Sequence, residues 1–130
     1  MIFGVFFVGL VIANILGSML KAKEVNREII YMAILFYLLA ALMWAFLYTF
    51  LEWLDPTSFN LNLSQVQSNF AAFKYYSFVT ITTLGYGDIV PVSEVAKAFA
   101  ITEAVVGQLY LVVAVAWLVG MHVSSKSSKS

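Results

Sequence analysis

The residues with the clearest chemical potential form one short run, Thr83-Leu84-Gly85-Tyr86-Gly87-Asp88, and the chemistry belongs mainly to its backbone. Glycine adopts a positive φ at little steric cost, so Gly85 and Gly87 allow the chain to alternate between left- and right-handed conformations. Such alternation turns successive carbonyl oxygens toward one axis, where rings of oxygens replace the water shell of a cation. The Thr83 hydroxyl adds an oxygen at one end of the run. At the other end, the Asp88 carboxylate either anchors the run or raises the local cation concentration.

Other kinds of functional site find little support in the sequence. It holds no cysteine and one histidine, which excludes a disulfide scaffold, thiol chemistry and a histidine-based metal site. The phosphate-binding patterns G-x-G-x-x-G and G-x-x-x-x-G-K-[ST] are absent. Seven basic and seven acidic residues cancel, so no basic field indicates nucleic acid as a partner. With no catalytic constellation and no motif for an organic cofactor, we predict that the protein is not an enzyme.

The elements that position this run are predicted to lie in a membrane. Of the 130 residues, 62% are hydrophobic and 11% are charged, whereas soluble domains are about 25% charged. Three runs without a charged residue, at residues 2–20, 29–51 and 104–123, are each long enough to cross a bilayer core, which takes about 20 residues of helix. We therefore predict an all-α integral membrane protein with three spanning helices and lipid as its surroundings.

A fourth apolar segment lies directly before the glycine run. Residues 70–82 would extend only about 20 Å as a helix, which is too short to span, so we expect a re-entrant helix. The negative end of its dipole would then point toward the start of the run and favour a cation there.

The basic residues predict the orientation in the membrane. Lys21, Lys23 and Arg27 lie between the first two spans, and Lys126 and Lys129 follow the third. Because basic residues near span ends collect on the cytoplasmic side, the N-terminus is expected outside the cytoplasm and the C-terminus inside. The expected location is the plasma (inner) membrane of the cell. No helix carries an arginine at every third position, which argues against voltage sensing in its usual form.

The glycine run resembles the T-x-G-Y-G-D signature of the tetrameric potassium channel family of two-transmembrane, re-entrant pore-loop proteins, with the frequent extra threonine at Thr82. The resemblance covers residues 29–123 and implies an outer helix at 29–52, a pore helix at 70–82, a filter at 83–88 and an inner helix at 95–122. Outside it we expect an additional N-terminal transmembrane helix with a basic linker at 1–28 and a disordered tail at 124–130. Because the chain carries one signature and each ring needs four strands, the resemblance implies a homotetramer around a potassium pathway.

The resemblance also implies roles for individual residues. The ligands of the potassium ions would be the carbonyl oxygens of Thr83, Leu84, Gly85 and Tyr86, with the Thr83 hydroxyl. The residues that would support this filter are Thr82, Gly87, Asp88, Tyr75, Tyr76 and Glu103. Of these, Tyr75 and Tyr76 are expected to form an aromatic cuff whose hydroxyls hold Tyr86 outward.

The hydrogen-bond partners of two acidic residues near the predicted filter, Asp88 and Glu103, are open at this point. Val79 stands where some relatives have a glutamate that pairs with the filter aspartate, so we expect Asp88 to rely on a neighbour's Tyr or Trp instead. Glu103 is a carboxylate inside a span, which needs a partner or a function. Behind the filter its candidate partners are Lys74, Ser77 and Tyr76, and exposure at the membrane interface is the alternative.

The third span carries the candidate gate. Gly107 lies at the spacing from Asp88 where the family places its hinge glycine, and a glycine inside a helix permits bending. The alternative is a packing glycine that lets two helices approach closely. The candidates for lining the cavity and gate share one helical face, with Gln108 nearby: Leu111, Val115 and Val119. An apolar stripe of this kind also suits helix contacts.

Taken with the resemblance, these observations predict a potassium-selective channel that conducts passively. Two other functions stay open: a weakly selective cation channel on the same scaffold, and a non-conducting subunit or assembly module. Regulation would come from lipid, pH, ions at the filter, a partner, or a part of the protein that lies outside this sequence.

Overall fold

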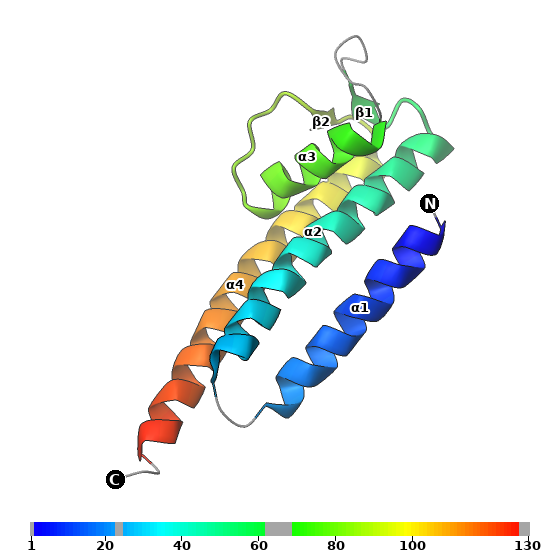
Figure 1. Cartoon of the computed structure of the whole chain (residues 1–130). Coiled ribbons are helices and arrows are strands. Elements are labelled where there is room, and N and C mark those ends of the chain that lie inside the picture. The colour runs from blue at the N-terminus through cyan, green and yellow to red at the C-terminus, as the bar shows by residue number, and fades with distance from the viewer. Residues whose placement is uncertain (1, 23–24, 62–68, 128–130) are drawn as a thin grey trace.

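The computed structural model describes residues 2–22, 25–61 and 69–127. Three long helices run alongside one another, and a short helix lies across one end of two of them (Figure 1). In chain order the elements are α1 (Ile2–Lys21), α2 (Arg27–Leu54), β1 (Phe59–Asn60), α3 (Asn69–Ile81), β2 (Val90–Pro91) and α4 (Glu94–Ser127). The N-terminus lies toward the end that carries α3, and the α1–α2 linker and the C-terminus lie at the opposite end.

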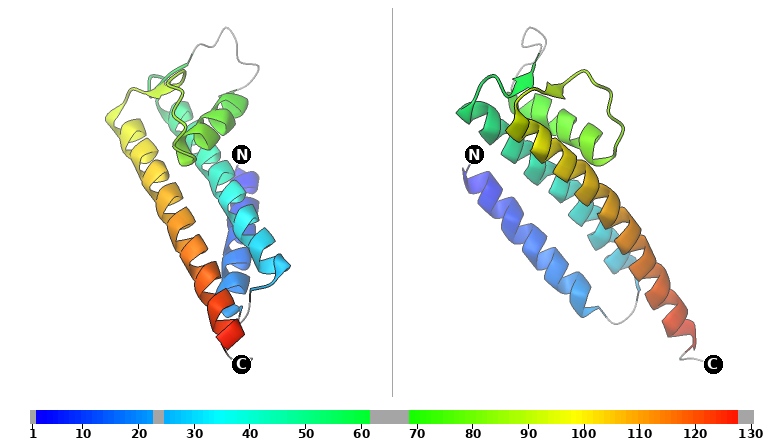
Figure 2. Two further views of the ribbon diagram at one scale, coloured as in Figure 1. Left: turned by 90° about the vertical axis from the view of Figure 1, so that its left-hand side faces the viewer. Right: turned by 180° about the vertical axis from the view of Figure 1, so that it is seen from behind.

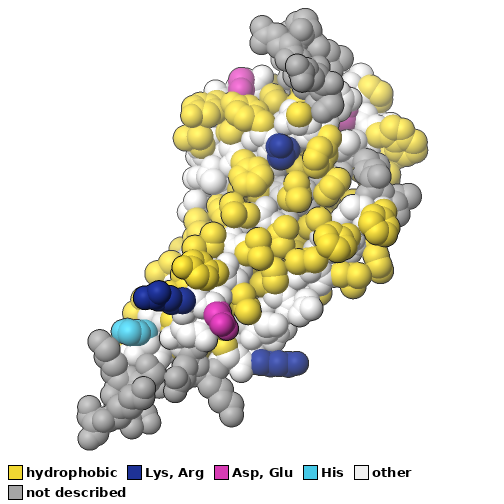
Figure 3. Space-filling view, in the orientation of Figure 1, with side chains coloured by type: hydrophobic (Ala, Val, Ile, Leu, Met, Phe, Trp, Pro, Cys, Tyr) yellow, Lys and Arg dark blue, Asp and Glu magenta, His cyan; other side chains and the backbone are white. Residues whose placement is uncertain are grey.

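Helices α1, α2 and α4 are long and apolar enough to cross a membrane, over Phe3–Lys21, Arg27–Leu54 and Glu94–Val123. On the face drawn in Figure 3, hydrophobic side chains cover the middle, and the few charged side chains lie toward the two ends. The chain is thus an all-α membrane protein, and its strands in the described residues are limited to the two-residue β1 and β2.

The helices extend beyond the charge-free runs that predicted them. Helix α2 begins two residues early because the Asn26 side chain accepts a hydrogen bond from the Ile29 N–H and caps it. It continues through Glu52 to Leu54, since the Glu52 side chain is buried rather than interfacial. Helix α3 begins and ends one residue earlier than expected.

The prediction of a disordered tail at 124–130 is wrong for its first four residues. Helix α4 continues to Ser127, because adding a residue to an existing helix costs much less than nucleating one. Residues 128–130, and Lys23 of the basic linker, lie outside the described residues.

One face of α2 is built for close packing. Ala41 and Ala45, one helical turn apart, are fully buried, and such small residues let neighbouring helices approach closely. Beyond them Tyr48 enters a core of mostly aromatic, buried side chains from α2, β1, α3 and α4: Tyr48, Phe59, Phe73, Tyr76 and Ala96. This cluster packs α3 against both α2 and α4, and the left-hand view in Figure 2 shows α3 beside the upper parts of these two helices.

Helix α1 packs along α2 (Figures 1 and 2). A Cβ added at Gly4 would lie 3.1 Å from the Phe46 ring, so that glycine allows the two helices to approach. Helix α1 is thus a further long apolar helix that packs against α2.

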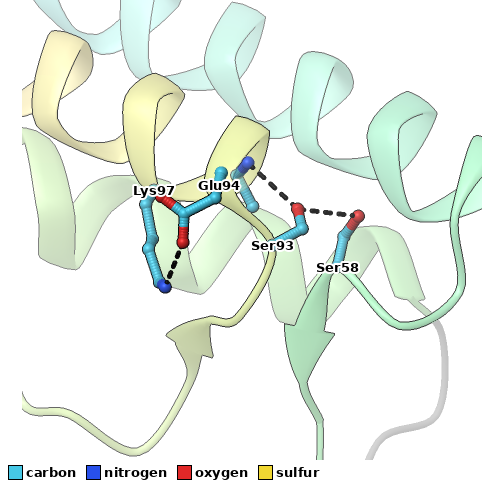
Figure 4. A network of polar contacts seen from close by, with 5 residues as sticks. Ser58, Ser93, Glu94 and Lys97 are labelled. Carbon is cyan, nitrogen blue, oxygen red and sulfur yellow. Dashed lines mark hydrogen bonds and ion pairs between the residues drawn. The ribbon is translucent and has the colours of Figure 1, made fainter.

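The start of α4 is tied to the segment that follows α2. The Ser93 hydroxyl accepts from the Ala96 N–H at 3.2 Å, which caps the helix, and donates to Ser58 Oγ at 3.3 Å (Figure 4). The buried Ser58 carbonyl also accepts from the Val92 N–H at 2.8 Å. Beside this cap, Lys97 pairs with Glu94 at 2.8 Å. With the β1–β2 pairing, these bonds hold the segment that leaves the glycine run.

Candidate functional site

The backbone of the glycine run alternates in conformation. Thr83, Gly85 and Gly87 have φ values of 59°, 58° and 77°, whereas the intervening residues do not have positive φ. The sequence predicts this freedom for the two glycines. It does not predict it for Thr83, because a β-branched residue at positive φ is a strained outlier. Strain of this kind costs about 1–3 kcal/mol and is typical of functional segments.

The N–H groups of the run turn back to the end of α3. Thr83 N–H donates to the Thr80 carbonyl at 2.9 Å, and the Leu84 and Gly85 N–H groups donate to the Val79 carbonyl at 2.9 and 3.2 Å. Within the described part of the chain, the carbonyls of residues 83–86 accept no hydrogen bond. Because backbone carbonyls that accept no hydrogen bond need another partner, a bare cation suits them.

The side chains of the run are not covered by their own chain. Leu84 and Tyr86 are 56% and 65% exposed, which is unusual for large apolar groups next to a packed core. No three His, Cys, Asp or Glu side chains gather into a metal site among the described residues. Any cation bound here would therefore be held by backbone oxygens and the Thr83 hydroxyl.

The Asp88 end of the run is anchored within the same chain. The Tyr75 hydroxyl donates to Asp88 Oδ2 at 2.6 Å, and the Ile89 N–H donates to Asp88 Oδ1 at 3.1 Å. The bond from Tyr75 lowers the pKa of the Asp88 carboxyl below its ordinary value. The same bond, with lesser contributions from desolvation and the carboxylate charge, raises the pKa of Tyr75 to about 12. Asp88 thus has a tyrosine of its own chain as a partner, and a Tyr or Trp partner from a neighbour stays a prediction.

The two adjacent tyrosines point in different directions. Tyr75 is half-exposed beside the run, whereas Tyr76 is buried, with its ring centroid 5.0 Å from that of Tyr48 and 5.5 Å from that of Phe59. Within one chain, neither hydroxyl has Tyr86 as its hydrogen-bond partner in the described residues. The expected cuff around Tyr86 stays a prediction.

The Thr83 end of the run contacts α4. The Gln108 amide donates to Thr83 Oγ1 at 3.2 Å. One residue earlier, Gly107 is buried against the last residue of α3: an added Cβ would lie 2.6 Å from both the carbonyl oxygen and Cγ1 of Ile81. Helix α4 runs without a break through this point. The geometry supports the packing role of Gly107, and bending there stays a prediction.

Glu103 is fully buried behind α3 rather than exposed at the interface. It receives a hydrogen bond from the Tyr48 hydroxyl at 2.5 Å and contacts the Ser77 hydroxyl, which also lies 2.7 Å from the Ala41 carbonyl. Ser77 has one proton and the carbonyl has none, so the two contacts of Ser77 need a second proton. A neutral, protonated Glu103 supplies it and joins α2, α3 and α4.

Two hydroxyls on α2 were missed by the sequence analysis. Tyr37 donates to the Ile81 carbonyl at 2.9 Å, at the end of α3, and Tyr48 donates to Glu103. Their spacing of eleven residues is about three helical turns, which places both on one face. Polar hydroxyls on one face of an otherwise apolar helix were the signal in the sequence that could have identified them.

The candidate gate residues Leu111, Val115 and Val119 are exposed in the single chain.

Comparison with known proteins agrees with this geometry. A family model described as "Ion channel" matches residues 29–123, which hold α2, α3, the glycine run and most of α4. Over 43 residues, the chain is 49% identical to the voltage-gated potassium channel Kch of Escherichia coli strain K12. That stretch is 33% of this chain and 10% of the relative, so the chain spans a small part of that protein. No solved structure matches the chain. Because the family match covers more than half of the sequence, this chain belongs to the ion channel family.

Proposed function

We propose that the protein is a potassium-selective channel that conducts ions passively along their electrochemical gradient. The ligands of the ions are the carbonyl oxygens of Thr83, Leu84, Gly85 and Tyr86, with the Thr83 hydroxyl. The observation that carries this proposal is the alternation of φ at residues 83, 85 and 87, together with carbonyls that accept no hydrogen bond in the described residues. The potassium channel similarity over 43 residues supports the choice of ion.

The surroundings of the filter favour cations at both of its ends. Helix α3 ends at Ile81, two residues before the filter, so its negative dipole end lies beside Thr83. The Asp88 carboxylate at the outer end is kept ionised by Tyr75 and attracts cations toward the mouth. Thr82, Gly87, Tyr76 and Glu103 support the filter from behind and at its ends.

A single chain supplies one strand of the pathway, so the proposal requires a homotetramer. Four copies around one axis complete each oxygen ring, and closed cyclic symmetry is the common arrangement of such assemblies. The exposed Leu84 and Tyr86 and the exposed apolar side chains on α4 supply surface for neighbouring subunits. In this arrangement Leu111, Val115 and Val119 line the cavity and lower gate. The filter end with the N-terminus lies outside the cytoplasm, and the C-terminus lies inside.

Potassium flux from liposomes tests the proposal. Purified protein should release potassium from loaded vesicles, barium should block the release, and Tyr86→Ala should abolish it while the assembly keeps the native mass of a tetramer. Flux without preference for potassium over sodium would instead favour a weakly selective cation channel. Absence of flux from both proteins, each folded and assembled, would favour a non-conducting subunit and overturn the proposal.

A further inference from the structure

The contact between Gln108 and Thr83 joins the inner helix directly to the innermost oxygen of the filter. Gln108 Nε2 lies 3.2 Å from Thr83 Oγ1, and both residues are exposed on the surface that their own chain leaves uncovered. The adjacent Gly107 brings α4 close enough for this contact, because its missing Cβ leaves room for the Ile81 carbonyl.

The contact with Gln108 uses part of the hydrogen-bonding capacity of the Thr83 hydroxyl. A hydroxyl has one proton and two lone pairs, whereas the amide nitrogen of glutamine only donates. The Gln108 N–H therefore takes one lone pair of Thr83 Oγ1 and leaves the other available. Thr83 also sits at φ 59°, a conformation that a threonine rarely adopts without support from its surroundings.

We propose that Gln108 is a positioning residue that fixes the Thr83 hydroxyl so that its free lone pair faces the ion pathway. The innermost cation site then depends on a side chain of the inner helix as well as on the filter. This inference rests on the proposed function, since it names a further residue that sets the strength of one of its ion sites.

Barium is a suitable probe because it is a divalent cation close in size to potassium, and the site nearest the cytoplasm is the first that it meets from that side. The experiment records potassium currents in planar bilayers with barium added on the side of the C-terminus. Gln108→Leu keeps the approximate size of the side chain and removes the donor. We expect its barium block to weaken by about tenfold, or about 1.4 kcal/mol in total, because the four Thr83 hydroxyls remain at the site and lose only the donor that orients them.

A double-mutant cycle separates positioning of the hydroxyl from a general effect on packing. Thr83→Val keeps the shape of Thr83 without its hydroxyl, so Gln108→Leu should not weaken the block further in that background. In a Thr83→Ser background, which keeps the hydroxyl, the effect of Gln108→Leu should persist. An equal effect in all backgrounds would show a packing role and overturn the inference.

A shorter amide provides a test that does not depend on assembly of the Thr83 variants. Gln108→Asn keeps the polarity of the cavity but withdraws the donor by one methylene, so we expect it to resemble Gln108→Leu. If Gln108→Asn keeps normal block, polarity rather than the contact matters, and the inference fails. Val112→Ala, one turn further along α4, serves as the control with unchanged block. Wild-type protein that does not conduct would overturn the proposed function, whereas unchanged block in a conducting Gln108→Leu channel would overturn this inference alone.

Discussion

Replacing Gly107 by alanine distinguishes a packing glycine from a purely flexible one, because the two roles predict opposite changes in stability. Alanine is favoured over glycine inside a helix by about 1 kcal/mol, so a glycine with open space around it should tolerate the change and gain stability. At Gly107 the added Cβ would lie 2.6 Å from the carbonyl oxygen and 2.6 Å from Cγ1 of Ile81.

The neighbouring atoms have little room to move. Ile81 is the last residue of α3 and is almost fully buried, and its carbonyl accepts the Tyr37 hydroxyl at 2.9 Å. Overpacking costs about 1–3 kcal/mol, and a Cβ 2.6 Å from a backbone carbonyl oxygen belongs at the upper end, about 2–3 kcal/mol. This exceeds the gain in helix propensity of about 1 kcal/mol. We therefore expect Gly107→Ala to lower the free energy of unfolding by about 1–2 kcal/mol per chain.

Unfolding of the purified protein in detergent, followed by helical circular dichroism, measures this difference. Gly120→Ala is the matched control, since Gly120 lies in the same helix and an added Cβ there meets no atom within 4 Å. The control should be as stable as the wild type or slightly more stable. If the Gly107→Ala protein is as stable as the wild type or more stable, the packing role is refuted, and flexibility of the helix remains the explanation for Gly107.

Three further predictions concern the residues around the filter. Glu103→Gln should keep wild-type stability because its amide N–H still donates to Ser77 and its amide oxygen still accepts from Tyr48. Glu103→Leu should lose about 2 kcal/mol or more because the buried Tyr48 hydroxyl loses its acceptor. Equal thermal stability of the two variants would contradict this. The Tyr75–Asp88 bond lowers the pKa of Asp88 and raises that of Tyr75 to about 12. The contribution of this bond to the free energy of unfolding should therefore be lost as the pH falls through the lowered pKa of Asp88, and also as the pH rises through about 12, the pKa of Tyr75. Tyr75→Phe should remove both losses from the pH dependence of stability. Gly85→Ala should cost about 1–2 kcal/mol because its φ is 58°; unchanged unfolding would show that the backbone adapts.

The features that depend on local sequence were predictable. Charge-free runs indicated the three spans, the short apolar segment indicated α3, and the glycine spacing indicated positive φ at Gly85 and Gly87. Each follows from the length or conformational preference of a few neighbouring residues. The ends of α2 were harder to predict from the sequence, because the capping side chain of Asn26 and the burial of Glu52 determine where the helix begins and ends.

The features that depend on pairing across the chain were not predictable. Thr83 adopts a positive φ although its β-branched side chain disfavours it, and the contacts of the filter with α3 and α4 accompany that conformation. For Glu103, the sequence left several partners open, and the fold selects Ser77 and the unforeseen Tyr48. Such choices require the relative positions of helices that are distant in sequence.

The reversal potential under bi-ionic conditions tests the proposed function most directly. With potassium on one side of a bilayer and an equal concentration of sodium on the other, the current of the reconstituted protein should reverse at a voltage strongly displaced toward potassium permeation. Tyr86→Ala should abolish the current, as it abolishes the flux from liposomes. A wild-type current that reverses near zero voltage, with equal permeability for the two ions, would contradict potassium selectivity.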